Sequence, residues 1–150
     1  MSEAARDDRL YPTRPILAVS AAVFRDGRVL VARRARAPLV GLYSLPGGLV
    51  EVGETLRAAA ARELAEEVGV AADILAFVDH VEPIRFERGR AREHYVIAAF
   101  VARWKSGEAR AGLEADAVAW VEPSEVARLP TTPELPAIVA KAARLERSLP

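Results

Sequence analysis

Residues 48–70, GLVEVGETLRAAAARELAEEVGV, constrain the fold of this 150-residue chain more than any other stretch. Alanine and leucine are frequent from residue 56 onward, and both favour the helical conformation. Thr55 suits the N-cap position before this segment, and Gly69 suits the left-handed position just after a helix. We therefore predict one helix between Thr55 and Gly69.

The predicted helix carries an apolar stripe with carboxylates beside it. Successive residues turn by about 100° around a helix axis, so the apolar residues of this segment fall on one stripe, which is expected to pack against a sheet. Glu63, Glu66 and Glu67 fall on an adjacent arc, where like charges one turn apart repel each other. A divalent cation between them would relieve the repulsion, and Mg²⁺ prefers carboxylate oxygen. The apolar stripe consists of Leu56, Ala60, Leu64 and Val68.

An ordinary solvated face, with ion pairs to Arg62, is the alternative explanation for these carboxylates. The segment before the helix favours a cation site instead. Its LPGG turn ends in Gly47 and Gly48, where the backbone must bend or lie close to another group. Two further acids, Glu51 and Glu54, follow this turn and precede the helix. A glycine turn followed by acids at fixed offsets is a more specific signal than any single glutamate.

The composition excludes several other kinds of site. The chain has no cysteine, so disulfides, thiolate metal sites and cysteine nucleophiles are excluded. His80 and His94 are too few for a histidine-based zinc site of the usual kind. Lysine plus arginine equal aspartate plus glutamate at 21 each, so no basic excess points to duplex nucleic acid or a membrane surface.

The length and the 51% hydrophobic content fit one globular domain. Residues 1–14 mix charges and lack the apolar segment of a secretory signal, so we expect a flexible N-terminal arm there. Residues 15–150 are expected to form the single domain. The longest apolar run, residues 95–102, is too short to span a bilayer. We therefore expect a cytoplasmic protein.

Apolar segments separated by turn residues predict several strands. Asp26-Gly27 between two apolar runs is a strong signal for a hairpin. Pro83 lies within a third run and implies an edge or a bulge there. The strands expected in chain order are residues 16–24, 28–34, 74–86, 93–104 and 117–121.

Two helical segments are predicted after the last strand. Residues 123–129 are expected to form a short helix. Thr132-Pro133-Glu134 is expected to begin a terminal helix with proline at its first position, and apolar residues then recur at helical spacing. Together, the elements predict an α/β/α sandwich, in which a mixed β-sheet lies between helices.

The spacing within residues 48–70 completes the pattern. Gly48 is followed by five residues and Glu54, and Glu54 is followed by seven residues and Arg62-Glu63. An aliphatic residue, a free position, two glutamates, one more residue, a glycine and Val70 follow. The stretch resembles the box of the Nudix hydrolases, and it matches every fixed position of that box without a gap. The resemblance covers most of the chain and implies the same α/β/α sandwich.

The resemblance also implies an activity and roles for the box residues. Nudix hydrolases cleave the pyrophosphate of a nucleoside diphosphate linked to another group, with Mg²⁺ as the cofactor and Mn²⁺ as a substitute. Glu54 and Arg62 match positions that brace the loop and the helix. The positions that match metal ligands are Gly48, through its carbonyl, Glu63, Glu66 and Glu67.

The resemblance leaves the general base open, because family members use either a box glutamate or an acid on a later loop. Glu66 and Glu67 are the candidates within the box. Glu114 is the later-loop candidate, since its spacing of six residues before Trp120 is similar to one in MutT-like members. Glu108 is the alternative on that loop. For both loop acids, a solvated surface charge is an equally good explanation.

The resemblance also leaves the substrate open. Arg33 and Arg34 end a predicted strand, where they either contact a phosphate or base of the substrate or form a solvated strand end. This pair is similar to MutT-like members, whereas residues 131–133, TTP, depart from the asparagine that reads guanine there. Pro83 is near the position of a proline in ADP-ribose pyrophosphatases.

ADP-ribose or a similar nucleotide sugar is therefore the first expectation for the substrate. A MutT-like nucleoside triphosphate activity is the second, and a non-catalytic nucleotide-binding domain is the third. The expected partner is a small-molecule nucleotide, with neither duplex nucleic acid nor a membrane involved. A homodimer is left open.

Overall fold

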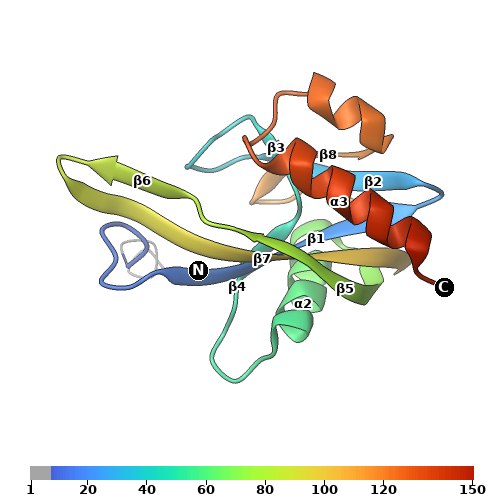
Figure 1. Ribbon diagram of the computed structural model, residues 1–150, viewed down its shortest axis with the longest axis horizontal. Helices are drawn as coiled ribbons and strands as arrows, with labels where there is room; N and C mark the ends of the chain where they lie inside the picture. The colour runs from blue at the N-terminus through green and yellow to red at the C-terminus, as the bar shows by residue number, and fades with distance from the viewer. Residues whose placement is uncertain (1–7) are drawn as a thin grey trace.

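The computed structural model describes residues 8–150. It is a mixed β-sheet with a helix on each side, which confirms the predicted α/β/α sandwich (Figure 1). The helical elements are α2 (Leu56–Val68), the 3₁₀ helix η1 (Pro123–Arg128) and α3 (Leu135–Ser148). The strands are β1 (Ile16–Arg25), β2 (Arg28–Arg34), β3 (Tyr43–Ser44), β4 (Gly47–Leu49), β5 (Ala71–Val81), β6 (Ile84–Glu87), β7 (Arg90–Ser106) and β8 (Ala115–Val121).

The central strand β1 separates two halves of the hydrophobic core. The strands run in the order β3-β2-β1-β7-β5, while β4 pairs with β1, β6 with β7 and β8 with β2. Because side chains alternate along a strand, Ala21 and Val23 pack with α2 while Ala22 and Phe24 pack with α3. The two helices therefore cover opposite faces of the sheet, as Figure 1 shows.

Helix α2 begins and ends as its sequence predicts. The Thr55 hydroxyl accepts a hydrogen bond from the Ala58 N–H at 3.1 Å, and Gly69 ends the helix with φ of 72°. Leu64 and Val68 are fully buried against the sheet, which confirms the predicted apolar stripe. This packing fixes the direction in which the carboxylates of the helix point.

Strand β4 attaches the glycine turn to the centre of the sheet. Gly47 and Gly48 pair with Ser20 and Val19 of β1 in antiparallel register. A Cβ atom on Gly47 would lie 2.1 Å from the Val19 carbonyl oxygen, so only glycine fits there. The backbone of the turn is thereby held against β1 and beside α2.

The long, slightly interrupted strand predicted over residues 74–86 is divided into two strands, because β5 ends at Val81 and β6 begins at Ile84. The break includes Pro83, which has no N–H to donate to a strand ladder. The strand predicted over residues 93–104 extends at both ends to form β7. Arg88-Gly89 is therefore the whole turn of the β6–β7 hairpin, which projects from the sheet in Figure 1.

The C-terminal helix begins later than predicted. Pro133 and Glu134 form a turn, and α3 starts at Leu135. The Leu135 N–H donates to the Thr132 carbonyl at 3.2 Å, which closes the turn before the helix begins. Leu135 and Val139 then bury the apolar face of α3 against the sheet, as its periodicity predicts.

Residues 1–7 of the predicted N-terminal arm lie outside the described residues, so the arm and the domain boundary at residue 15 stay predictions. Within the described part, the Tyr11 hydroxyl donates to Glu87 at 2.6 Å and the Tyr11 N–H donates to the Arg92 carbonyl at 2.8 Å. Tyr11 therefore lies against the β6–β7 hairpin. None of the helices within residues 8–150 has the length and apolar content to cross a membrane.

Candidate active site

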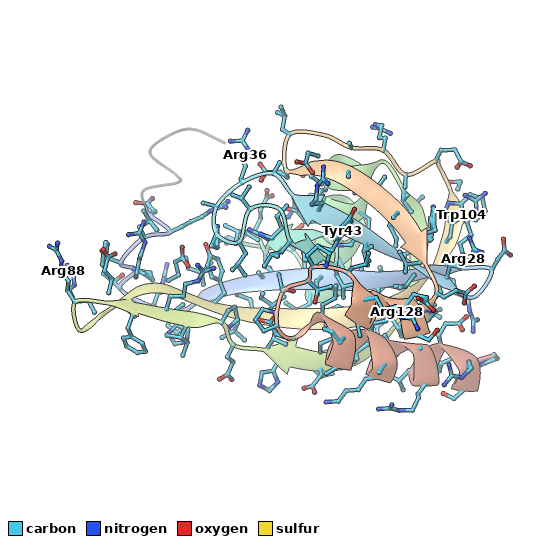
Figure 2. The ribbon with its side chains drawn as sticks, turned by 90° about the horizontal axis from the view of Figure 1, so that it is seen from above. Arg28, Arg36, Tyr43, Arg88, Trp104 and Arg128 are labelled. Atoms are coloured by element: carbon cyan, nitrogen blue, oxygen red, sulfur yellow. The ribbon has the colours of Figure 1, made fainter. Side chains whose placement is uncertain are left out.

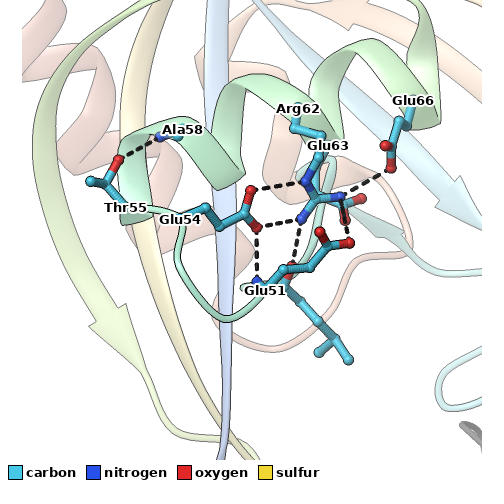
Figure 3. Close-up of polar contacts among 8 residues, drawn as sticks. Glu51, Glu54, Thr55, Ala58, Arg62, Glu63 and Glu66 are labelled. Atoms are coloured by element: carbon cyan, nitrogen blue, oxygen red, sulfur yellow. Dashed lines mark hydrogen bonds and ion pairs between the residues drawn. The ribbon is translucent and has the colours of Figure 1, made fainter.

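Arg62 is the centre of a polar cluster on α2 and the preceding loop (Figure 3). Its Nε and Nη2 atoms donate to both oxygens of Glu54, at 3.0 and 2.6 Å. The other Nη2 bond goes to the Leu49 carbonyl at 2.9 Å. Nη1 donates to Glu63 at 2.8 Å and to Glu66 at 3.0 Å. All five guanidinium N–H groups therefore have partners, and they connect β4, the acidic loop and the helix.

The Glu54 carboxylate is the best-satisfied acid of this cluster. It accepts the two bonds from Arg62 and a third from the Glu51 N–H at 2.8 Å. Hydrogen bonds from Arg62, then the bond from Glu51, lower the pKa of Glu54 to about 2. The same bidentate contact raises the pKa of Arg62. The predicted bracing contact between Glu54 and Arg62 is therefore present.

Glu63 lies between this cluster and the glycine turn. A Cβ atom on Gly48 would lie 2.3 Å from the Cδ atom of Glu63, so the carboxylate occupies space that only glycine leaves free. Burial raises the pKa of Glu63, although the hydrogen bond from Arg62 acts in the opposite direction. Gly48 and Glu63, matched to the same metal site by sequence, are thus in close contact.

Glu67 has a different environment, one turn further along α2. Its Oε2 atom accepts a hydrogen bond of 2.8 Å from the Gly47 N–H. Burial raises its pKa to about 7, and the negative charges of Glu63 and Glu114 act in the same direction. Gly47 N–H and the charge of Arg34 lower this pKa but do not outweigh burial. Glu67 is thus a partly buried acid whose hydrogen-bond donor is an uncharged backbone group.

Within residues 8–150, no three acidic or histidine side chains lie close enough together to form a ready-made metal site. Glu66, with 61% of its side chain exposed, points to Arg62 rather than to Glu67. The donor chemistry nevertheless suits a divalent cation, because Glu63 and Glu67 offer hard oxygen ligands whose ionised forms are disfavoured by burial. A cation beside them would stabilise those ionised forms.

The structure separates the two arginines that were predicted together. Arg34 lies near enough to Glu67 for its charge to act on that acid, and its Nε atom donates to the Pro38 carbonyl at 2.7 Å. Arg33 points to the opposite face, since successive strand residues alternate, and it pairs with Asp116 at 2.7 Å. Of the pair, Arg34 is the one on the side of the carboxylates.

The two loop acids also differ in position. The Glu114 charge acts on Glu67, and the Glu114 carbonyl accepts a hydrogen bond from the Ala35 N–H at 3.0 Å. Glu108 is 81% exposed and pairs with Arg25, at the end of β1. Arg25 is roughly 17 Å along the strand from the residue that pairs with Gly47. Position therefore favours Glu114 over Glu108.

Sequence analysis missed two contacts at this site. The first is the Gly47 N–H bond to Glu67, which requires β4 to pair with β1. The second is Arg36, whose Nε atom lies 3.6 Å from the Glu114 carboxylate and donates to the Leu113 carbonyl at 3.2 Å. No signal in the sequence could have indicated Arg36, because it lies in the loop after β2.

A family model, the NUDIX domain, matches residues 14–142. The chain belongs to the Nudix family. The glycine turn, the acidic loop and the carboxylates of α2 described above are the Nudix box of this protein, in the expected order. The agreement extends beyond the box, since the match takes in every strand of the sheet and the first half of α3.

Two curated proteins are similar to this Nudix chain. An ADP-ribose pyrophosphatase of Methanocaldococcus jannaschii is 34% identical over 108 residues, which cover 71% of this chain and 61% of that protein. A putative 8-oxo-dGTP diphosphatase 2 of Mycobacterium tuberculosis is 53% identical over 66 residues, 43% of this chain and 47% of that protein. The chain therefore spans about half to three fifths of the length of these curated relatives.

A solved structure matches a larger part of this chain than the two curated proteins do. The crystal structure of a MutT NUDIX hydrolase from Burkholderia pseudomallei matches with a TM-score of 0.75 and 32% identity. The match covers 85% of this chain and 98% of that one.

Proposed function

We propose that this protein is a Mg²⁺-dependent Nudix pyrophosphohydrolase. One observation carries the proposal: Glu67 is a partly buried carboxylate beside Glu63 and the glycine turn, with a pKa raised to about 7 by burial. Such an acid costs stability whenever it is ionised and lacks a cation. A site for a divalent cation accounts for a carboxylate at this position.

In this proposal, the residues of the box have separate roles. Mg²⁺, with Mn²⁺ as a substitute, would be held by Glu63, Glu66, Glu67 and the Gly48 carbonyl. When bound, it neutralises charge on the phosphate oxygens and makes a water a better nucleophile. Arg62 and Glu54 keep the loop and the helix in place.

The general base of the proposed reaction is Glu114. It accepts the proton of the attacking water while the pyrophosphate bond breaks. Its side chain is 59% exposed on a loop that also contains Gly112, so it is accessible to water and can adjust as the substrate binds. Glu66 and Glu67 remain the alternatives within the box, whereas Glu108 pairs with Arg25 at the end of β1, away from the glycine turn.

ADP-ribose or a similar nucleotide sugar is the proposed substrate. The relative named ADP-ribose pyrophosphatase supports this choice, at 34% identity. Its alignment covers 108 residues of the two proteins, whereas that of the putative 8-oxo-dGTP diphosphatase covers 66. A MutT-like activity on nucleoside triphosphates is the second candidate, supported by the 53% identity to the putative 8-oxo-dGTP diphosphatase. In both cases, the proposed contact to a substrate phosphate is made by Arg34, because its charge acts on Glu67 whereas Arg33 pairs with Asp116.

A nucleotide panel with Mg²⁺ tests the function and ranks the substrates. ADP-ribose, other nucleotide sugars and nucleoside triphosphates are incubated separately, and the phosphorylated products are identified. We expect the highest kcat/KM with ADP-ribose or a nucleotide sugar, complete loss of hydrolysis in EDTA, and recovery with Mg²⁺ or Mn²⁺. Binding of a nucleotide without turnover would instead support the non-catalytic alternative, and full activity in EDTA would contradict the metal site.

A further inference from the structure

Two loops meet beside Glu67, and Arg36 connects them. The first loop, residues 35–42, follows β2. The second, residues 107–114, precedes β8 and carries Glu114. The Arg36 Nε atom donates to the Leu113 carbonyl at 3.2 Å and lies 3.6 Å from the Glu114 carboxylate. One side chain of the first loop thus contacts both the backbone and the acid of the second.

The first loop is held firmly by Arg34 at its base. The Arg34 N–H donates to the Leu42 carbonyl at 2.9 Å, and the Arg34 carbonyl accepts from the Gly41 N–H at 2.8 Å. The Arg34 side chain adds its bond to the Pro38 carbonyl at 2.7 Å. These three bonds close the loop on itself, so Arg36 extends from a fixed support.

The second loop is held at its end, residues 112–114, mainly by polar contacts. Leu113 is 81% exposed and Glu114 is 59% exposed, so apolar burial contributes little to their position. The polar contacts at this end are those of Arg36, the Ala35 N–H bond to the Glu114 carbonyl, and the Gly112 N–H bond to the Ala115 carbonyl at 2.8 Å. Arg36 supplies the contact made by the Glu114 side chain itself.

We propose that Arg36 is a positioning residue, which holds the Glu114 carboxylate on the side of Glu67 through its contacts with the end of loop 107–114. The inference rests on the proposed function, in which Glu114 acts as the base. It assigns a role to Arg36 that depends on Glu114, since Arg36 touches neither the box carboxylates nor the glycine turn in the contacts described above. Loss of Arg36 should therefore affect catalysis only through Glu114.

Arg28→Ala provides a matched control for Arg36→Ala. Arg28 forms a similar exposed pair, with its Nε atom 3.3 Å from Glu122, at the other end of β2. Figure 2 shows Arg28 and Arg36 on separate parts of the molecule. Both variants remove one exposed arginine and one ion pair, but only one of them affects loop 107–114.

A double-mutant cycle with Glu114→Gln tests the dependence on that acid. We expect Arg36→Ala to lower kcat about tenfold with little change in KM, and to have no further effect once Glu114 is replaced. Arg36→Lys, which keeps the charge, should recover part of the loss. Additive losses in the double variant would overturn the inference, as would a wild-type kcat for either Arg36→Ala or Glu114→Gln.

Amide hydrogen exchange provides a readout that does not require activity. In Arg36→Ala, the amides of Ala35 and Gly112 should lose protection, while the same amides in Arg28→Ala should exchange as in the wild type. Unchanged exchange in Arg36→Ala would overturn the inference even if the protein is active. If the wild-type protein cleaves no nucleotide, the proposed function fails, and exchange alone decides whether Arg36 fixes the loop.

Discussion

Arg62 and Glu67 lie on one helix but in opposite electrostatic situations. Arg62 has all five of its N–H donors bonded, mostly to carboxylates, and it lowers the pKa of Glu54 to about 2. Glu67 is partly buried and accepts its hydrogen bond from the uncharged Gly47 N–H, and burial raises its pKa to about 7. The carboxylates around Arg62 are bonded to a guanidinium, whereas the charge of Arg34 near Glu67 does not outweigh the effect of burial.

The contrast indicates a division of labour within the box. A charge cluster with all its hydrogen bonds satisfied stabilises the conformation of a loop. A buried acid with an elevated pKa is instead typical of a functional site. We infer that the Arg62 cluster maintains the loop and helix, and that Glu67 serves the chemistry. Three substitutions can break or sharpen this contrast.

Glu67→Gln should have the largest effect, and it should affect activity alone. We expect kcat to fall by at least about 10², the low end for a catalytic group. The side-chain amide introduced by this substitution can still accept the Gly47 N–H bond, and the variant has one buried ionisable group fewer. In EDTA at pH 8, its Tm should therefore equal or exceed that of the wild type. Early melting, or an unchanged kcat, would contradict the assignment.

Arg62→Ala should show the reverse pattern, with stability as the main loss. It removes the hydrogen bonds that Arg62 donates to Glu54, Glu63 and the Leu49 carbonyl, which we expect to lower the free energy of unfolding by about 1–3 kcal/mol. Urea unfolding at pH 7 measures this. Arg57→Ala is the control on the same helix, where one bond of 3.1 Å to the Ile74 carbonyl is lost. Equal losses in the two variants would show that the Arg62 cluster has no special role.

The smallest effect is expected for Glu54→Gln, and it concerns how the stability of the protein depends on pH. Its pKa is lowered from 4.5 to about 2, so its contribution to stability is present above pH 4.5 and is lost as the pH falls towards 2. Glu54→Gln should therefore destabilise the protein at pH 7, and the difference from the wild type should shrink as the pH decreases from 5 to 2. Urea midpoints across this range measure the trend, and a constant difference would argue against the ionised pair.

Much of the fold follows from local sequence signals. Thr55 and Gly69 define the ends of α2 because capping depends on a few neighbouring residues, and Asp26-Gly27 defines the first hairpin in the same way. The short strand β4 was not predicted, because Gly47 and Gly48 have no strand preference and pair only because β1 lies beside them. Such pairing is a property of the assembled sheet.

For the site too, the sequence predicts what depends on neighbouring residues and not what depends on the assembled sheet and loops. Spacing along one helix was enough to place Glu63, Glu66 and Glu67 on the same side of α2. It could not show that Glu66 turns to Arg62 while Glu67 is partly buried, since this depends on the loop folded against them. Nor could it show that Arg36 meets Glu114, because the two residues come from loops that only the pairing of β2 with β8 brings together.

Mn²⁺ titration by isothermal calorimetry tests the central claim most directly, because it measures the cation site without a substrate. The wild-type protein, Glu67→Gln and Arg33→Ala are compared at pH 8 under the same conditions. Our account predicts that the wild type and Arg33→Ala bind Mn²⁺ with the same affinity and that Glu67→Gln binds at least about tenfold more weakly. Equal Mn²⁺ affinity in Glu67→Gln and the wild type would contradict the account.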